Sequence, residues 1–568
     1  MQISGHVGEK LPGLERIGNL GSTGNQVKKK PSESTERLID SLYARKGVWG
    51  RLVQLDPLDE VIRQIADAGE PAAIPDLLPI LTIGDRKAIL ASAKAIHHLL
   101  KMLNPPDFVR FDEFVRQGYA DWQVRREPWY SMKPKDVGHL ASMGEVSVSL
   151  LGIASCHTNG YVREAAVREL GKTETGAELP FLLIRTNDWV PEIRSSARHF
   201  LLNRIRSDHI HHLMHWLPLA LRLSNVGRDD HSAILEAVRA LMASSEPRAA
   251  LREGFESQDQ FVRRFCFQLA LNSNVADLLT VLRRAFVDHD AQVRKEAVLR
   301  LHAILPNRGS KELLIRARSD GCMMVRREAL HIFAEKYADE ADQEFQSALL
   351  DANVAVRVEA QYYFQKKGTF DLRAYYSHRL ETSNSRQLCA SIAGVGETGV
   401  AKDSQLVERF IHNQSSKARA TALHAIAKLN PDAYFDKFVL ALDDASSKVA
   451  REAALALSKK PNLVGGQRLW EIYDSCRYPH GKHWALFLLA RINKWDSIAF
   501  LIQSLTDQND SCMELSQTYI ARWFARYNRS FATPTAEQLF RLRDVLSRCD
   551  LLLSSGTQRQ LNSLMKSF

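Results

Sequence analysis

Residues 288–305 read DHDAQVRKEAVLRLHAIL, and the pattern inside this stretch decides the fold. Val293 and Arg294 are followed by Ala297, and Leu301 continues the apolar series four residues later. Residues four apart lie on one face of an α-helix, so this spacing predicts an amphipathic helix. The quoted stretch is therefore one half of a helical unit rather than a strand or a loop.

The other half of the unit is the segment before it. Val275–Val287 carries leucines at helical spacing, and an acidic turn separates it from the second segment, Ala291–Leu305. Short acidic side chains suit such a turn because they can accept hydrogen bonds from the unpaired N–H groups that open the next helix. One hairpin of this kind cannot bury its own apolar face, whereas stacked neighbours can.

The Val-Arg motif of this unit, with a small residue three positions after the arginine, recurs along the chain. Clear copies occur at Val162-Arg163, Ile193-Arg194, Val262-Arg263, Val325-Arg326 and Val356-Arg357, and looser copies continue near Arg419, Val449, Lys482 and Glu514. Most successive copies are about 31 to 33 residues apart. An internal period of this length is typical of a solenoid.

The arginines of the motif and the aspartates of the turns form a predicted structural ladder. We expect each arginine to pair with an aspartate of a turn in its own or the next repeat, although an array of phosphate-binding arginines is the alternative. The predicted ladder consists of Arg163, Arg194, Arg263, Arg294, Arg326 and Arg357 with Asp188, Asp288, Asp320 and Asp351.

The order Asp, Val-Arg, Glu-Ala, Leu resembles the HEAT-repeat superfamily, in particular its short variant. Residues 288–301, 320–333 and 351–364 carry the resemblance best. It implies an all-α fold, namely a right-handed α-solenoid of about twelve two-helix HEAT-like repeats with an irregular N-terminal helical region. It implies little about function, because such solenoids serve many tasks.

Composition and charge narrow the functional classes. The chain has 568 residues, 45% of them hydrophobic, a formal net charge of +10 and seven cysteines without a CxxC pair. These values favour a folded cytoplasmic protein and argue against a disulfide framework or a zinc knuckle. No apolar run is long enough to span a bilayer. We expect no membrane association, no cofactor and no small-molecule substrate.

The rhythm of the repeats divides the chain into five parts. They are a flexible leader (1–32), an N-terminal helical cap region (33–103), an aromatic and basic insertion (104–144), the repeat solenoid (145–530) and a C-terminal helical cap (531–568). Within the solenoid, the glycines of residues 394–399 predict a long turn between helices.

The insertion is a candidate partner-binding segment. Aromatic and basic side chains alternate in it, and both types are enriched at interface hot spots and at single-stranded nucleic acids. The alternative is that the aromatic residues fill the join between the cap and the solenoid. The candidate residues are Trp122, Arg125, Arg126, Trp129 and Tyr130.

A second candidate is a short basic track. Arg264, Lys295 and Arg327 each follow the arginine of the motif in three central repeats. Helices pack about 8–10 Å apart, so these side chains can meet successive phosphates of a nucleic acid. Glu296 and Glu328 follow directly and dilute the positive charge.

No catalytic or metal-binding pattern emerges. His211 and His215 are four apart within residues 208–216, but further ligands are not evident nearby, which favours a plain histidine cluster. The aromatic residues near Trp523 are predicted to form the apolar face of the penultimate hairpin. Two groups of HEAT-like enzymes exist, bilin lyases and DNA glycosylases, and neither group's functional residues match this chain.

The leading hypothesis is therefore a non-catalytic scaffold or adaptor that binds another macromolecule, most simply a protein, in the groove of the solenoid. The alternative is a nucleic-acid-binding solenoid that uses the basic track. A HEAT-fold enzyme of lyase or DNA-repair type is a distant third reading.

Overall fold

The computed structural model describes residues 30–43, 57–117, 123–224, 229–244, 248–272, 277–304, 310–368, 370–549, 552–566 and 568. All regular elements within these ranges are helices, as the repeat pattern predicts. They fall into two units, residues 1–304 and residues 305–568. The solenoid predicted over 145–530 is thus shared between both units, and most of the predicted leader lies outside the described residues.

The first unit holds the predicted cap region, the insertion and the first repeats. Its helices are α1 (Glu33–Tyr43), α2 (Leu58–Asp67), α3 (Ile74–Leu77), α4 (Ile80–Ile83), α5 (Arg86–Leu100), α6 (Phe108–Gln117), α7 (Gln123–Tyr130), α8 (Val137–Ala141), α9 (Ser147–Ala154), α10 (Gly160–Leu170), α11 (Leu179–Arg185), α12 (Pro191–Leu202), α13 (Ile210–Leu223), α14 (Ser232–Ala243), α15 (Arg248–Phe255), α16 (Gln260–Asn272), α17 (Leu278–Ala285) and α18 (Ala291–His302).

The second unit holds the remaining repeats and the predicted C-terminal cap. Its helices are α19 (Ser310–Arg318), α20 (Met323–Lys336), α21 (Ala338–Ala348), α22 (Val354–Lys367), α23 (Leu372–Thr382), α24 (Ser385–Thr398), α25 (Ser404–Glu408), α26 (Ser416–Leu429), α27 (Phe435–Ala441), α28 (Ser447–Leu457), α29 (Gly466–Ser475), α30 (Pro479–Leu489), α31 (Lys494–Gln503), α32 (Asp510–Ala525), α33 (Ala536–Cys549) and α34 (Ser555–Met565).

From α9 onward the helices come in pairs, one pair for each sequence repeat. Within the described residues, five pairs run from α9/α10 to α17/α18 in the first unit and seven from α19/α20 to α31/α32 in the second. These pairs make the fold an α-solenoid of HEAT-like repeats and are consistent with the predicted number of about twelve.

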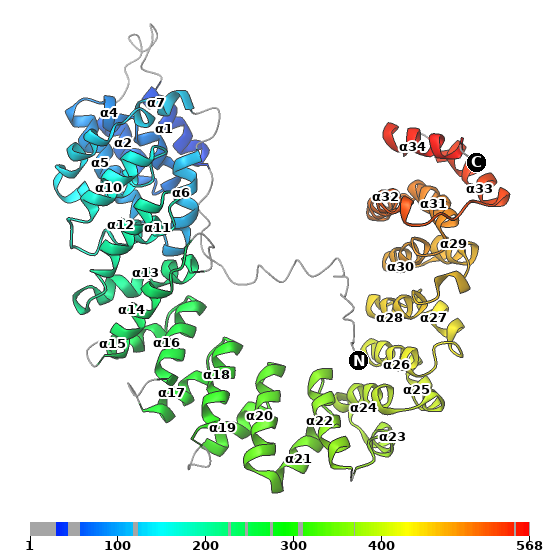
Figure 1. The fold of residues 1–568 in the computed structure, drawn as a ribbon. Coiled ribbons are helices and arrows are strands. Elements are labelled where there is room, and N and C mark those ends of the chain that lie inside the picture. The colour runs from blue at the N-terminus through cyan, green and yellow to red at the C-terminus, as the bar shows by residue number, and fades with distance from the viewer. Residues whose placement is uncertain are drawn as a thin grey trace. The chain divides into compact units, whose positions relative to one another are not determined.

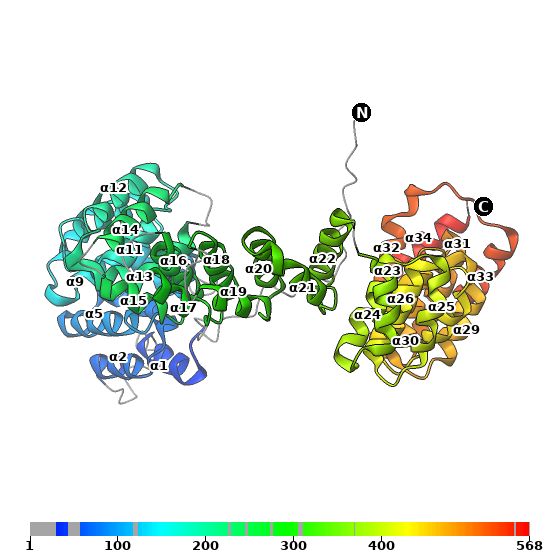
Figure 2. The ribbon, with the colours of Figure 1, turned by 90° about the horizontal axis from the view of Figure 1, so that it is seen from below.

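The helices of the second unit stand in two rows. The second helices of the repeats, α24, α26, α28, α30 and α32, each contact the next one and form one row (Figure 1). The first helices, α25, α27, α29 and α31, form the other row, which is also visible from below (Figure 2). We call the exposed surface of α20, α22, α24, α26, α28, α30 and α32 the second-helix face.

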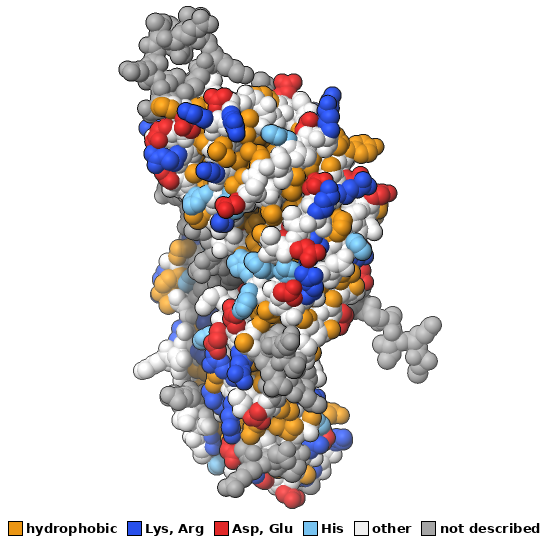
Figure 3. Space-filling view, turned by 90° about the vertical axis from the view of Figure 1, so that its left-hand side faces the viewer, with side chains coloured by type: hydrophobic (Ala, Val, Ile, Leu, Met, Phe, Trp, Pro, Cys, Tyr) orange, Lys and Arg blue, Asp and Glu red, His pale blue; other side chains and the backbone are white. Residues whose placement is uncertain are grey.

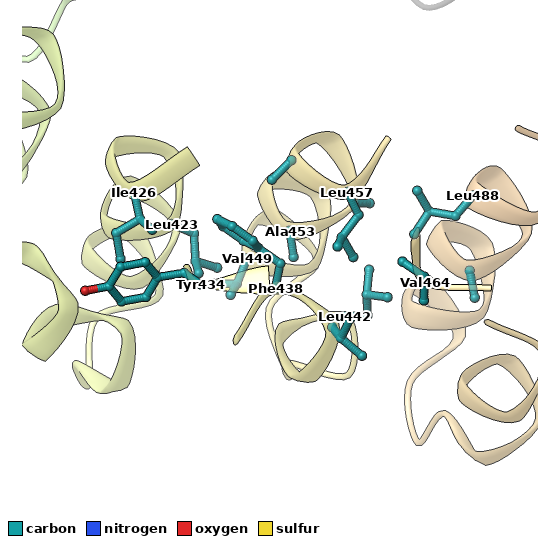
Figure 4. Packing of buried hydrophobic residues seen from close by; sticks show 14 of the residues in the cluster. Leu423, Ile426, Tyr434, Phe438, Leu442, Val449, Ala453, Leu457, Val464 and Leu488 are labelled. Carbon is teal, nitrogen blue, oxygen red and sulfur yellow. The ribbon is translucent and has the colours of Figure 1, made fainter. Parts of the chain in front are cut away.

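The core of the second unit lies between its two rows. Figure 4 shows this packing in the second unit, where Leu423 of α26, Phe438 of α27, Val449 of α28 and Leu488 of α30 belong to one apolar cluster. Each of these side chains is at most 2% exposed. Because every repeat buries its apolar face against the next, the core grows with the number of repeats rather than with the width of the protein.

An arginine–aspartate rung joins consecutive repeats. The guanidinium of the Val-Arg motif pairs with the turn aspartate 25 residues further along the chain, in the next repeat. The rungs are Arg163–Asp188 (2.8 Å), Arg263–Asp288 (3.0 Å), Arg326–Asp351 (2.7 Å) and Arg419–Asp444 (2.8 Å), and Lys482–Asp507 (2.8 Å) continues the series.

Each rung also fixes the turns on both sides. Arg326 donates to the carbonyl oxygen of Asp320 in its own turn (2.7 Å), while the carboxylate of Asp351 accepts the N–H of Asn353 (2.7 Å). Asn353 in turn caps α22 by accepting the N–H of Ala355. The turn aspartate therefore orders the residue that caps the helix and does not cap the helix itself.

The predicted insertion is anchored to the first unit by buried charge. Arg116 of α6 contacts Asp188 (3.1 Å), which also accepts Arg163 and Arg185 (both 2.8 Å). Asp112 lies beside Arg116 (3.2 Å) and contacts Arg185. Burial raises the pKa of Asp112 to about 6, although Arg116 favours its ionised form. The described part of the insertion is thus a structural element of this unit.

Two of the glycines of residues 394–399 do not form the predicted turn, and only Gly399 follows the helix. Gly394 and Gly396 lie inside α24, and they are there because neighbouring residues leave no room for a side chain. A Cβ at Gly394 would lie 2.1 Å from the Tyr376 ring, and one at Gly396 would lie 2.6 Å from the Cβ of Ala425. The glycines allow α24 to approach α23 and α26 closely. The sequence pattern indicated a turn instead, because glycine usually destabilises a helix.

The rung Arg419–Asp444 makes a prediction about stability and pH. Burial acts to raise the pKa of Asp444, but Arg419 and the N–H of Ser446 outweigh it and lower the pKa. A carboxylate with a lowered pKa stabilises the fold above its unfolded-state pKa of about 3.9, and this stabilisation is lost as the pH falls through the folded-state value. We expect Asp444→Asn to cost about 1–3 kcal/mol at pH 7 and progressively less below pH ~4, measured by urea unfolding.

Asp544→Asn is the control for this experiment. Asp544 pairs with Arg548 on the same helix, and both side chains are more than half exposed. This change should alter the free energy of unfolding by less than about 0.5 kcal/mol at either pH. Equal effects of both variants at pH 7 would contradict the role assigned to the rung.

The close approach of α24 to α26 makes a second prediction. Gly396→Ala should destabilise the second unit by about 1–3 kcal/mol, because the new methyl group overlaps Ala425 and the helices must separate. Gly556→Ala, within α34, should be neutral or slightly stabilising, because its Cβ would meet nothing closer than 3.9 Å. Thermal unfolding of both variants measures the difference, and similar melting temperatures would refute the packing argument.

Candidate partner-binding face

The second-helix face presents the same positions in successive repeats. The residue after the motif arginine and the residue four further on lie on one side of the helix. In α20 these are Arg327 and His331, whose side chains are 40% and 52% exposed. In α22 they are Val358 and Tyr362, which are 48% and 61% exposed. These positions are available to a partner because the core and the rungs do not use them.

Helix α22 carries an exposed apolar stripe. Val354, Val358 and Tyr362 follow one another at intervals of four residues and are 49%, 48% and 61% exposed. The helix also has its ordinary buried series, which includes Val356 and Phe364. A helix of a repeat needs one apolar face for the core, so the second one is unexplained by folding.

The second unit also has a groove, to which Arg357 of the same helix contributes. Its volume is about 240 Å³, and its walls come from α22, α24, α26 and α28. The floor consists largely of small side chains, since α24 and α26 pack closely. The lining residues are Ala352, Arg357, Cys389, Ala390, Ala393, Lys417, Ala420, Thr421, His424 and Glu452.

Charged pairs border the groove and the stripe. Nδ1 of His424 lies 2.9 Å from a carboxylate oxygen of Glu452, and Nε2 of His331 lies 3.0 Å from Glu359. Glu359 also accepts Arg327 (2.9 Å). An apolar centre with a polar, partly paired rim is the usual arrangement of a protein-binding surface.

The motif arginine of α22 departs from the rung pattern at this place. Arg357 pairs with Glu397 of α24 (2.5 Å) rather than with a turn aspartate, and Gln361 donates to the same carboxylate (2.8 Å). Arg357 is 5% exposed, so its charge serves packing. The groove therefore opens where the regular joint between repeats is replaced.

The predicted ladder residues are placed at the turns throughout. Besides the pairs given above, Arg194 donates to the carbonyl oxygen of Asp188 (2.7 Å) and lies 3.2 Å from Asp229. Arg294 donates to the carbonyl oxygen of Asp288 (2.8 Å), and the carboxylate of Asp320 accepts the N–H of Cys322 (2.7 Å).

The predicted basic track is partly neutralised by carboxylates. Arg264 forms two hydrogen bonds with Asp290, whose pKa burial would raise but which Arg264 and the N–H of Gln292 hold below its usual value. Arg327 pairs with Glu359, as described above. Arg264 and Lys295 belong to the first unit and Arg327 to the second. Both paired arginines have a structural use, which weakens the case for phosphate binding.

The candidate residues of the insertion divide into three groups. Trp129 is 1% exposed and belongs to the core of the first unit, so it packs internally rather than facing a partner. Tyr130 is partly buried, with its ring centroid 6.3 Å from that of His157. Trp122 and the side chains of Arg125 and Arg126 lie outside the described residues.

The histidine cluster of residues 208–216 lies mainly on α13. His211, His212 and His215 are exposed, whereas His209 is buried. No group of three or more metal-ligating side chains occurs among the described residues.

On the face drawn in Figure 3, basic, acidic and histidine side chains are intermixed rather than sorted by charge. In the described part of the chain, no helix is both long and apolar enough to cross a bilayer.

The stripe on α22 was missed by the sequence reasoning, although a signal for it exists. Val354, Val358 and Tyr362 are offset by two residues from the buried series of the same helix. An α22 that is apolar on two faces differs from most second helices of the array.

Fold and repeats together define a HEAT-like α-solenoid. Comparisons with protein-family profiles and with curated proteins found no match. Solved structures with a similar fold include importin beta (13% identity, TM-score 0.29, covering 94% of this chain and 83% of that one) and Kap95p bound to RanGDP (10%, 0.34, 93% and 73%). A third is the condensin Cnd3-Cnd2 subcomplex of S. pombe (12%, 0.32, 95% and 85%). These likenesses concern the fold alone.

Proposed function

We propose that the protein is a non-catalytic scaffold that binds a protein partner on the second-helix face of its second unit. The observation that carries the proposal is the exposed apolar stripe of Val354, Val358 and Tyr362 on α22, a helix that also contributes Arg357 to the groove. The stripe supplies apolar contact area, and the groove can accept a side chain of the partner. The rim pairs of His331 and His424 supply hydrogen-bonding groups that set the register.

The chemistry of the partner follows from this surface. An apolar stripe along one helix fits the apolar face of a partner helix or an extended segment with apolar side chains. A nucleic acid would place phosphates near Glu359 and Glu452, which are unfavourable neighbours. We further propose a cytoplasmic location, which is supported by the seven cysteines, all of them free.

Substitution of the aromatic residue of the stripe tests the proposal. We expect Tyr362→Ala to weaken partner binding by roughly 2 kcal/mol, about 30-fold in Kd, because exposed aromatic anchors dominate such interfaces. Affinity capture of the tagged full-length chain, with quantification of each co-purifying protein, identifies the partner. Titration of that partner then measures the Kd.

Tyr161→Ala is the matched control, since Tyr161 is 73% exposed on α10 of the first unit and lies outside the proposed face. The proposal requires a partner that the wild type and the Tyr161 variant bind equally well and the Tyr362 variant binds poorly. Equal binding by all three, or no stoichiometric partner at all, would disprove it.

A further inference from the structure

Three arginines gather on the second-helix face near its C-terminal end. Arg491 follows α30, Arg522 lies in the last turn of α32, and Arg526 is the residue that ends α32. All three are exposed, and α30 contacts α32. We call them the arginine patch.

Within the described part of the chain, the arginine patch has no acidic partner, unlike the paired basic residues on and near the same helices. Arg468 pairs with Asp436 (3.0 Å), Arg477 with Asp443 (2.7 Å) and Lys482 with Asp507 (2.8 Å). Among the described residues, no carboxylate forms an ion pair with Arg491, Arg522 or Arg526. Their charges are therefore left uncompensated by the fold.

Aromatic rings hold these side chains in place. The guanidinium carbon of Arg491 lies 3.5 Å from the ring centroid of Phe487, and Nη1 donates to the Phe487 carbonyl oxygen (2.9 Å). The guanidinium of Arg522 lies 5.7 Å from the Tyr519 ring. Cation–π contacts of this kind restrict the arginines before any ligand arrives, which reduces the entropy lost on binding.

The arginines are close enough to repel one another. Burial lowers the pKa of Arg491, and the charges of Arg526 and Arg522 lower it further, against the favourable contact with Tyr519. Arg526 lies at the C-terminal end of α32, where the partial negative charge of the helix dipole stabilises its positive charge. An anion that binds between the arginines would relieve this repulsion. The arginine patch is therefore suited to a negatively charged ligand.

We propose that the arginine patch binds an acidic peptide segment, rich in Asp and Glu, of a protein partner. A guanidinium accepts a carboxylate through two parallel hydrogen bonds, and three guanidinium groups on two adjacent helices match a short run of carboxylates. The inference extends the proposed scaffold function, because α22 and α32 belong to the same face, but it does not depend on the apolar stripe.

The surroundings favour a peptide over a nucleic acid. Glu514 lies exposed on α32, and Glu452 lies on α28 of the same face, so a long phosphate backbone would meet repulsion on leaving the patch. The rings that a base would stack on are already engaged, since Phe487 faces Arg491 and Trp523 packs against Trp495 and Tyr527.

Binding of a fluorescent peptide of alternating Glu and Gly to the full-length chain tests this inference. We expect fluorescence polarisation to detect binding at low salt that weakens as salt is added. The triple variant Arg491→Gln, Arg522→Gln, Arg526→Gln should bind about tenfold or more weakly, whereas the corresponding Lys variants should retain part of the affinity. The double variant Arg522→Gln, Arg526→Gln serves if the triple variant is unstable.

The matched control removes the same charge from paired arginines. Arg468→Gln, Arg477→Gln, Arg548→Gln should change the Kd by less than about twofold, because these side chains already have acidic partners. Absence of peptide binding, or an equal loss in both triple variants, would overturn the inference. Tighter binding of a single-stranded DNA probe than of the peptide would overturn it in favour of a nucleic acid.

Tyr362→Ala separates this inference from the proposed function. The variant should bind the acidic peptide as the wild type does, since Tyr362 lies on α22. Loss of the cellular partner with retained peptide binding supports both proposals. If this variant still binds the partner and also binds the peptide normally, the proposed role of the apolar stripe is disproved and the inference about the arginine patch stands.

Discussion

A carboxylate shared by neighbouring repeats is the contact on which the array depends. Asp351 accepts the guanidinium of Arg326 from the preceding repeat and the N–H of Asn353 in its own turn. One side chain thus sets the distance between two hairpins and the point where the next helix begins. The apolar core supplies most of the stabilisation, but it is non-directional, and the rung selects the register in which the hairpins stack.

The rungs also determine where a partner can bind. Because each motif arginine is turned toward the turns, the next residue and the one four further on remain on the exposed side of the second helix. These positions differ between repeats, from Arg327 and His331 to Val358 and Tyr362, because neither the core nor the rungs use them. Different side chains at these positions can therefore give different partner specificities without disturbing the packing of the repeats.

Much of the fold was predictable because the same sequence pattern recurs in most repeats. The recurrence of Val-Arg and of the turn aspartates indicated the helix pairs, and the structure describes such pairs from α9 to α32. The glycines of α24 were misinterpreted, because a pattern along the chain carries no information about how closely α23 and α26 approach. The partner of Arg357 was also unpredictable, since Glu397 replaces a turn aspartate only through the altered packing of α24.

The candidate partner-binding face was harder to predict from the sequence than the fold. Arg264 and Arg327 resemble free basic residues in the sequence, and only the structure shows the carboxylates of the next repeats beside them. Conversely, Arg491 is far from Arg522 and Arg526 in sequence order, and its proximity to them depends on the stacking of α30 and α32.

The 25-residue offset between arginine and aspartate in most rungs has a consequence for how such a chain can change in length. Deleting or duplicating one whole period joins each arginine to an equivalent aspartate, so every joint closes as before. A deletion of half a period would leave a cation facing a helix instead of a turn. The junction of α22 with α24 departs from this spacing, because Arg357 needs Glu397 and would not fit a standard neighbour. Descendants of this protein should therefore differ by entire hairpins on either side of that junction and keep the junction itself.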